Sequence, residues 1–254
     1  MESATIEQPA RIRSMIEAVS YAASHDSTRY NLNAVRLESD AGDTLAIATD
    51  GHRLAIHREE GLTLPIHERG FSVPLKSIAD LRKTMARPNR LNGKTADIAV
   101  TSNSMEVVIA GRPSASIPEV DSDFPNWRQV VPESTPHRYT LTDPAGVAAA
   151  LAVFERVAMT NANAVKVTCN GETMALECDY SDDGVDVKAT ASFPVTTATD
   201  VPMEVSFGVN ARYFGDAIRQ AVGTVTLGFT DEFSPIRFDD AGGLSSVVMP
   251  MRLK

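Results

Sequence analysis

The sequence predicts an α+β protein built from two tandem copies of one domain, each with two helices packed on antiparallel sheet. Its 254 residues are 43% hydrophobic and 22% charged, the balance of a chain that folds around a core. Stretches with apolar residues at helical spacing are followed by runs of short alternating strands. The order of these stretches repeats at an offset of about 135 residues, far longer than a solenoid or propeller repeat.

The first helix of each half is predicted from the spacing of its apolar residues. Ile12, Met15, Ile16, Val19 and Ala23 lie on one face of a helix over residues 10–24. The matching helix of the second half spans 144–158, with Asp143 as its N-cap and Pro144 at its first position. Each helix therefore has one face to bury against a sheet.

Short alternating strands follow each of these helices. The first set is Ala34–Leu37, Thr44–Ala48 and Arg53–His57; the second is Val165–Cys169, Met174–Cys178 and Val185–Phe193. Cys169 lies beside the Asn170–Gly171 turn and Cys178 at the far end of its strand. The two cysteines are therefore not opposite each other, and we expect them to be small core residues.

A second helix and further strands complete each half. The helices are expected over 75–90, opened by Phe71–Pro74, and over 210–222, opened by Phe207–Asn210. The strands that follow are expected at Ala96–Val100 and Met105–Ile109, then at Thr224–Phe229, Ile236–Phe238 and Ser245–Pro250. The domains are predicted at 1–120 and 138–254, joined by a proline-rich linker over 121–137.

The charges are unevenly distributed between helices and the rest of the chain. The formal net charge is −9, which by itself argues against a nucleic-acid partner. The four expected helices nevertheless carry +6 and the remainder −15. One positive surface in an acidic protein is one interpretation, and an ordinary solvated helix face is the other.

The sequence lacks the common signatures of catalysis and metal binding. It contains no phosphate-binding GxxxxGK[ST], no HExxH and no GxSxG motif. Asp179–Gly184 resembles the first half of a calcium loop, but Thr190 stands at the twelfth position, where a bidentate Glu is required. Asp50, His52 and His57 are better explained as turn and strand residues than as metal ligands. We expect no catalytic residue, no metal site and no cofactor; a calcium- or zinc-dependent hydrolase is a distant alternative.

The sequence also indicates where the protein resides. No apolar run approaches the roughly 18 residues of a membrane span, and the N-terminus lacks a basic start followed by an apolar stretch. We therefore expect a cytoplasmic protein without a membrane partner.

Several segments resemble one family in collinear order. Arg29–Asn33 and then Ala48–Ala55 closely resemble the second domain of the bacterial DNA polymerase III β subunit, the β sliding clamp family. Phe124–Trp127 resembles the family's linker, and Asn210–Tyr213 falls where the family keeps an Asn and a Tyr three apart. Val247–Leu253 is similar to the end of the third domain. The resemblance covers nearly the whole chain and leaves out the family's first domain.

This resemblance implies two sliding-clamp (DNA clamp) domains and a DNA processivity factor. In the family, helices line a ring and meet the phosphates of double-stranded DNA without sequence specificity. The residues implied in DNA binding are Arg11, Arg13, Tyr30, Arg82, Lys83, Arg87, Arg90, Arg212 and Arg219.

The resemblance also implies a peptide-binding cleft between the two domains. In the family this cleft holds short linear motifs of polymerases, clamp loaders and repair proteins. Apolar, flexible side chains would form the groove, and Arg53, Asn210 and Tyr213 would orient the peptide backbone. By position, its residues here are Leu32, Thr49, Gly51, His52, Arg53, Leu54, Pro125, Val130, Asn210, Tyr213, Val247, Met249, Pro250, Met251 and Arg252.

Assembly follows from counting domains. A ring of six domains needs three copies of a two-domain chain, so we expect a homotrimer, with the strand Met105–Ile109 and the segment Ala158–Val167 as its edges. A monomer is the competing outcome. A non-encircling adaptor or decoy that binds clamp-binding peptides only is the alternative function, favoured by Asp26 close to Tyr30 and by a third helix with only Arg156 beside Glu155.

Overall fold

The computed structural model divides the chain into two compact units, which are described separately. Unit 1 spans Met1–Asn126 and unit 2 spans Trp127–Lys254, so the division falls inside the segment expected as a linker. The structure describes residues 2–84, 95–101, 103–109, 112–120, 122–158, 163–182, 185–197 and 204–252.

In the described residues of unit 1, two groups of four strands each pair in antiparallel order. Their orders are β5-β2-β3-β4 and β1-β6-β7-β8. The helix α1 packs on β3 and β4 and touches α2. The elements are β1 (Glu2–Ile6), α1 (Ala10–Ser20), η1 (Tyr30–Leu32), β2 (Ala34–Asp40), β3 (Asp43–Thr49), β4 (Arg53–Glu59), β5 (Phe71–Pro74), α2 (Leu75–Thr84), β6 (Ala96–Val100), β7 (Ser104–Ile109) and β8 (Arg112–Pro118).

Unit 2 repeats this order of strands and helices. Its strands pair in the order β13-β10-β11-β12-β9-β14-β15-β16. The long strand β12 pairs with β11 and then, through Val195–Thr197, with β9. The elements are η2 (Trp127–Val130), β9 (His137–Leu141), α4 (Pro144–Val157), β10 (Ala164–Cys169), β11 (Thr173–Asp182), β12 (Val185–Thr197), β13 (Val205–Asn210), α5 (Ala211–Gln220), β14 (Val225–Phe229), β15 (Ile236–Asp240) and β16 (Leu244–Val248).

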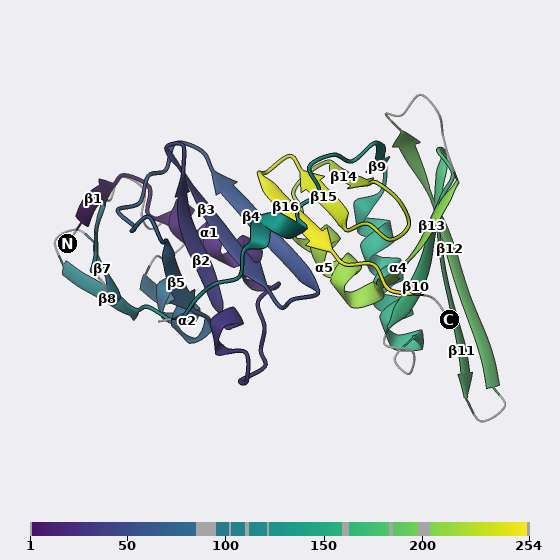
Figure 1. The fold of residues 1–254 in the computed structure, drawn as a ribbon, viewed down its shortest axis with the longest axis horizontal. Coiled ribbons are helices and arrows are strands. Elements are labelled where there is room, and N and C mark those ends of the chain that lie inside the picture. The colour runs from purple at the N-terminus through teal and green to yellow at the C-terminus, as the bar shows by residue number, and fades with distance from the viewer. Residues whose placement is uncertain are drawn as a thin grey trace. The chain divides into compact units, whose positions relative to one another are not determined.

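The predicted α+β fold with an internal repeat is therefore confirmed. In the described part of each unit, a strand and a helix are followed by four strands, a second helix and three strands. The helices α4 and α5 lie side by side in unit 2 (Figure 1). Their buried faces share one core with the sheet, in which Phe229 stacks on Tyr139 at 5.8 Å between ring centroids and meets the edge of Phe207 at 5.0 Å.

The caps of the unit 2 helices follow their sequences. Asp143 accepts a hydrogen bond from the Gly146 N–H at 2.9 Å, as predicted for the N-cap of α4, and Pro144 takes the first helical position. Asn210 caps α5 by accepting from the N–H groups of Arg212 and Tyr213 at 3.0 and 3.2 Å. Asn210 is thus occupied by the helix start.

Some element boundaries differ from the prediction. The first helix ends at Ser20 rather than near residue 24, although Ala23 is buried. Phe71–Pro74 and Phe207–Asn210 are strands that precede helices, because their backbones pair with β2 and β10. Of the helix expected over 75–90, the structure describes Leu75–Thr84; Arg87 and Arg90 lie outside the described residues.

The expected assembly edges are also corrected. The strand Met105–Ile109, in β7, lies between β6 and β8, and the strand of Ala158–Val167, β10, lies between β11 and β13. Neither is an edge, because β8 pairs with the outer side of β7 and β13 with the outer side of β10, and these two covering strands were not predicted from the sequence. β8 escaped prediction because it contains Pro113 and Pro118, which a terminal strand tolerates.

The cysteines are buried, as expected, and not opposite each other. Cys169 pairs across the sheet with Met174, and Cys178 with Ala189. Burial raises the pKa of the Cys169 thiol to about 12, so it is neutral at physiological pH. Among the described helices, none is long and apolar enough to cross a bilayer.

Candidate functional site

One carboxylate joins the two helices of unit 1. Glu17 Oε1 accepts from Arg13 Nε at 2.9 Å, four residues earlier on α1, and from Arg82 Nε at 2.7 Å on α2. The Arg13–Glu17 spacing was readable from the sequence, but the contact with Arg82, 65 residues away, was not. Two of the predicted DNA-binding arginines therefore share one counter-charge.

Arg11 is held in a similar way on the same helix. Its Nε donates to Glu59 Oε1 at 2.7 Å, and its Nη2 donates to the Glu60 carbonyl at 2.5 Å. The other oxygen of Glu59 lies 3.1 Å from His57 Nε2. Arg11 is about one third exposed, so it faces solvent beside a bound carboxylate.

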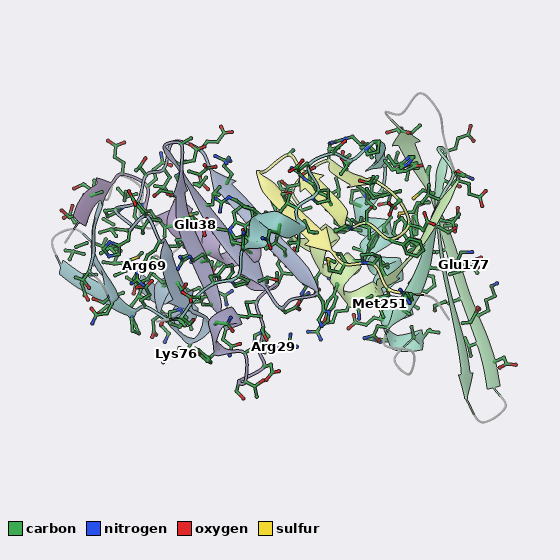
Figure 2. The ribbon with its side chains drawn as sticks, in the orientation of Figure 1. Arg29, Glu38, Arg69, Lys76, Glu177 and Met251 are labelled. Atoms are coloured by element: carbon green, nitrogen blue, oxygen red, sulfur yellow. The ribbon has the colours of Figure 1, made fainter. Side chains whose placement is uncertain are left out.

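The rest of α2 presents more open charge. Lys83 lies 3.3 Å from Asp80, and both side chains are more than 70% exposed. Lys76, on the first turn, is exposed (Figure 2). Solvent screens both of these exposed cations. Lys83 can therefore exchange Asp80 for another anion with little loss of free energy.

The helix surface of unit 2 is less charged. Arg212 and Arg219 both approach Asp216, at 3.9 and 2.5 Å. The solvent side of α4 carries alanines, Val153 and Arg156. A groove of about 490 Å³ lies between α4 and α5, lined by alanines of α4 together with Ile218, Arg219 and Ala221.

Every described arginine predicted to meet DNA thus has a carboxylate partner of its own unit. The cations are placed on helices, as predicted, but intramolecular carboxylates neutralise much of their charge. A phosphate that binds there must share or displace a carboxylate, which lowers the number of counterions released.

The predicted DNA residue Tyr30 lies at the start of η1 and is 63% exposed. It follows a tight turn in which Asp26 Oδ1 accepts from the N–H and the hydroxyl of Thr28, at 2.9 and 2.7 Å. These two hydrogen bonds lower the pKa of the Asp26 carboxyl below its usual value of 3.8. The turn therefore presents a fixed aromatic ring next to an ionised carboxylate.

The unit 1 residues predicted for the peptide cleft gather at the turn between β3 and β4. Asp50 Oδ1 accepts from the N–H groups of His52 and Arg53 at 2.9 and 3.1 Å, while Oδ2 accepts from Arg53 Nε at 3.0 Å. The Arg53 guanidinium is buried and lies 5.5 Å from the centroid of the Tyr21 ring. Arg53 thus braces the turn from inside, with its side chain engaged by Asp50.

Thr49 fixes the same turn from the other side. Its hydroxyl donates to the Arg53 carbonyl at 2.6 Å and accepts from the Gly51 N–H at 3.1 Å. Gly51 has φ +90°, a conformation that favours glycine. Leu32 and Leu54 are buried, and Pro125 is exposed. The turn is therefore a rigid wall element with Gly51 and His52 at its surface.

The unit 2 residues predicted for the cleft gather at the C-terminal strand and the start of α5. Met251 forms an isolated bridge to Gly208, with its N–H donating to the Gly208 carbonyl at 2.7 Å (Figure 2). This bridge lies two residues before Asn210, so Met251 and the α5 N-terminus are neighbours. Of the other members, Val247 is buried and Tyr213 and Pro250 are half-buried, while Met249, Arg252 and Val130 on η2 are exposed.

Two contacts in unit 1 were missed by sequence reasoning. Arg29 Nη1 donates to the Asp50 carbonyl at 3.0 Å, and Asn31 Nδ2 donates to the Asp123 carbonyl at 3.4 Å. Both residues lie in the segment that carries the family resemblance, but nothing in their spacing indicates these partners. In the described residues no three His, Cys, Asp or Glu side chains gather as metal ligands, and Asp183 and Gly184 of the calcium-like stretch lie outside them.

This chain is similar in sequence to known proteins. Residues 6–126 match the family model of the DNA polymerase III beta subunit, central domain. The β sliding clamp of Escherichia coli K12 is 28% identical over 96% of this chain and 64% of its own length; that of Caulobacter vibrioides NA1000 is 28% identical over 94% and 63%. The chain thus spans a little under two thirds of the length of these relatives.

Solved structures share the fold. The β subunit of Thermotoga maritima superposes with a TM-score of 0.85 at 20% identity, over 100% of this chain and 66% of that one. The Bartonella birtlesii clamp, bound to griselimycin, gives 0.84 at 20% identity, over 99% and 66%. Residues 6–126 therefore resemble the central domain of the DNA polymerase III β subunit, and the chain as a whole is similar in sequence and fold to the bacterial β sliding clamps.

Proposed function

We propose that this chain is a sliding-clamp-like processivity factor that encircles duplex DNA and docks short peptide motifs of a polymerase and a clamp loader. The proposal is supported by the collinear similarity of this chain to the clamps, which places both halves of the predicted peptide-binding residue set in one chain. The unit 1 half is a turn braced by Asp50 and Thr49, and the unit 2 half is a strand end fastened to Gly208. The proposal assigns the chain no catalytic residue and no cofactor.

The chemistry of both halves suits a short apolar peptide. Met249 and Val130 are exposed, and methionine adapts to side chains of different shape. Hydrogen bonds of Asp50 and Thr49 shape the Asp50–His52 turn, which lowers the ordering required when a peptide binds. The clamps of Bartonella birtlesii and Pseudomonas aeruginosa bound to griselimycin support a ligand site on this fold.

The peptide function is tested by titration. A fluorescein-labelled peptide that carries a clamp-binding motif of a bacterial replicative polymerase is titrated with the chain and followed by anisotropy. Met251→Ala should weaken binding about tenfold, or ~1.4 kcal/mol. Val153→Ala, which shortens an exposed apolar residue of α4, should leave the affinity unchanged. Absence of wild-type binding at high micromolar concentration would remove this function.

DNA encirclement requires self-association of this chain. Three copies would supply six units, and an uncovered strand edge favours pairing with a neighbour. We propose two such edges. One is β8, the terminal strand of unit 1. The other is the part of β12 that precedes its pairing with β9, where Val187 is exposed. Light scattering at tens of micromolar should give three times the 27.3 kDa of one chain.

The second candidate is an adaptor or decoy that binds clamp-binding peptides without encircling DNA. The pairing of each described arginine of the predicted DNA-binding set with a carboxylate favours it, because this pairing weakens phosphate attraction. A solution mass near that of one chain, together with peptide binding, would establish this candidate in place of the ring.

A further inference from the structure

The loop between α1 and β2 touches each segment of unit 1 that carries a predicted peptide-binding residue. This coupling loop, Asp26–Asn33, itself contains Leu32, and Tyr30 and Leu32 belong to the same 3-10 turn. Tyr30 is 63% exposed, whereas Leu32 is buried. The residue proposed to meet DNA and one proposed to meet peptides are thus two positions apart in one 3-10 turn.

Two side chains leave the coupling loop and fasten it to the remaining wall segments. Arg29 donates to the Asp50 carbonyl at 3.0 Å, at the turn that presents Gly51 and His52. Asn31 donates to the Asp123 carbonyl at 3.4 Å, two residues before Pro125. The loop therefore carries the candidate DNA contact and joins it to three separate pieces of the candidate peptide wall.

Hydrogen bonds, rather than burial, hold the Asp26–Tyr30 part of the coupling loop in place. Residues 25–30 are all exposed. Within the loop, Asp26 accepts from Thr28, its carbonyl accepts from the Arg29 N–H at 3.0 Å, and Asn33 Nδ2 donates to the same carbonyl at 3.1 Å. A segment held in this way opens locally at a lower free energy than a buried one. When it opens, the bonds of Arg29 and Asn31 to the wall break with it.

We propose that the coupling loop links the two ligands, so that duplex DNA held at Tyr30 raises the affinity for a docked peptide. Either ligand favours the closed form of the loop, and the second ligand then binds to a wall that is already ordered. Such coupling is reciprocal: the peptide tightens DNA binding by the same factor. The inference rests on the proposed function, since it needs both ligands, and Arg29 and Asn31 act in it as positioning residues.

The experiment measures peptide affinity with and without a short blunt DNA duplex at saturating concentration. The full chain and the labelled polymerase peptide described above are used, and the peptide is also titrated with duplex alone to exclude direct association. For the wild type, the duplex should lower the peptide Kd about fivefold, at the lower end of typical coupling. In Arg29→Ala and in Asn31→Ala, the ratio of the peptide Kd without duplex to the Kd with duplex should fall to about one. Arg29→Lys, which keeps a hydrogen-bond donor, should retain part of the wild-type ratio.

Ser27→Ala serves as the matched control. It changes an exposed residue of the same loop for which the structure gives no hydrogen bond to the wall, so it should keep the wild-type ratio. A second readout is amide hydrogen exchange at Gly51 and His52, which the duplex should slow in the wild type but not in Arg29→Ala. This readout distinguishes lost coupling from a general loss of structure.

The possible results are distinct. A wild type that binds both ligands with an unchanged peptide Kd overturns the coupling and leaves the proposed function standing. Full coupling in both Arg29→Ala and Asn31→Ala overturns the role of the loop. A wild type that binds neither ligand removes the proposed function, and the coupling with it.

Discussion

Asp50 shows how one side chain can shape a candidate binding wall. Its carboxylate accepts from two backbone N–H groups and from the buried guanidinium of Arg53. The sequence identified Asp50–Gly51 as a tight turn, and the hydrogen bonds agree with that interpretation. It did not predict that Arg53, expected to orient a peptide, is engaged beneath the turn; its role toward a peptide stays a prediction.

Replacing Asp50 by Ala should lower the free energy of unfolding by about 3 kcal/mol, because a buried guanidinium loses its partner. Urea unfolding measures the change. Asp186→Ala, at an exposed position of β12, is the control and should stay within about 0.5 kcal/mol of the wild type. Equal midpoints for the two variants would contradict the role given to Asp50.

The hydrogen bonds to Asp26 predict that the stability of the fold depends on pH in the acid range. The hydrogen bonds from Thr28 lower the folded pKa of Asp26 below 3.8, so they stabilise the fold at pH above that value. The contribution is lost as the pH falls through the lowered pKa. The melting temperature of Thr28→Ala should therefore be lower than that of the wild type at pH 6, and the difference between the two melting temperatures should vanish toward pH 2. A difference that persists at the lowest pH would indicate another cause.

At the scale of elements, Glu17 joins α1 to α2 and offsets two arginines at once. Glu17→Gln removes that negative charge, so Arg13 and Arg82 become available to phosphate. We expect DNA affinity to rise about threefold and the salt dependence to steepen by about 0.9 for each cation released. The stability should change by less than about 1 kcal/mol, because the pairs are partly exposed.

The matched control is Glu155→Gln on α4, which removes a helix carboxylate that pairs with no arginine among the described residues. Arg82→Glu combined with Lys83→Glu should act in the opposite direction and abolish salt-sensitive retention on DNA without changing peptide affinity. If Glu17→Gln and Glu155→Gln change DNA affinity equally, the effect is one of net charge, and the shared contact is not responsible.

The elements also mark where prediction from sequence stops. Helices with a clear apolar face and a cap, such as α4 behind Asp143, were predicted almost to the residue. β8, with its two prolines, and β13, which runs directly into Asn210 and α5, were missed because local pattern does not separate them from loop and helix. Their absence led to the wrong assignment of β7 and β10 as edges.

At the scale of the whole molecule, the internal repeat was the most informative feature of the sequence. The repeat of a helix, a run of strands, a second helix and further strands follows from periodicity alone, although not every strand of it does. Contacts between distant positions do not: Glu17 with Arg82 and Asn31 with Asp123 arise only when the chain folds. The residue types were therefore predictable, whereas the carboxylate pairing that moderates the positive helices was not.

Encirclement of DNA is tested most directly by comparing closed circular with linear DNA. The chain, at tens of micromolar, is incubated with a circular plasmid and passed over a gel-filtration column at low and high salt, before and after the plasmid is cut once. We predict that protein eluting with the circle resists high salt, because a topological link does not depend on phosphate contacts, and that cutting releases it. Equal elution with circular and linear DNA, lost from both at high salt, would contradict encirclement.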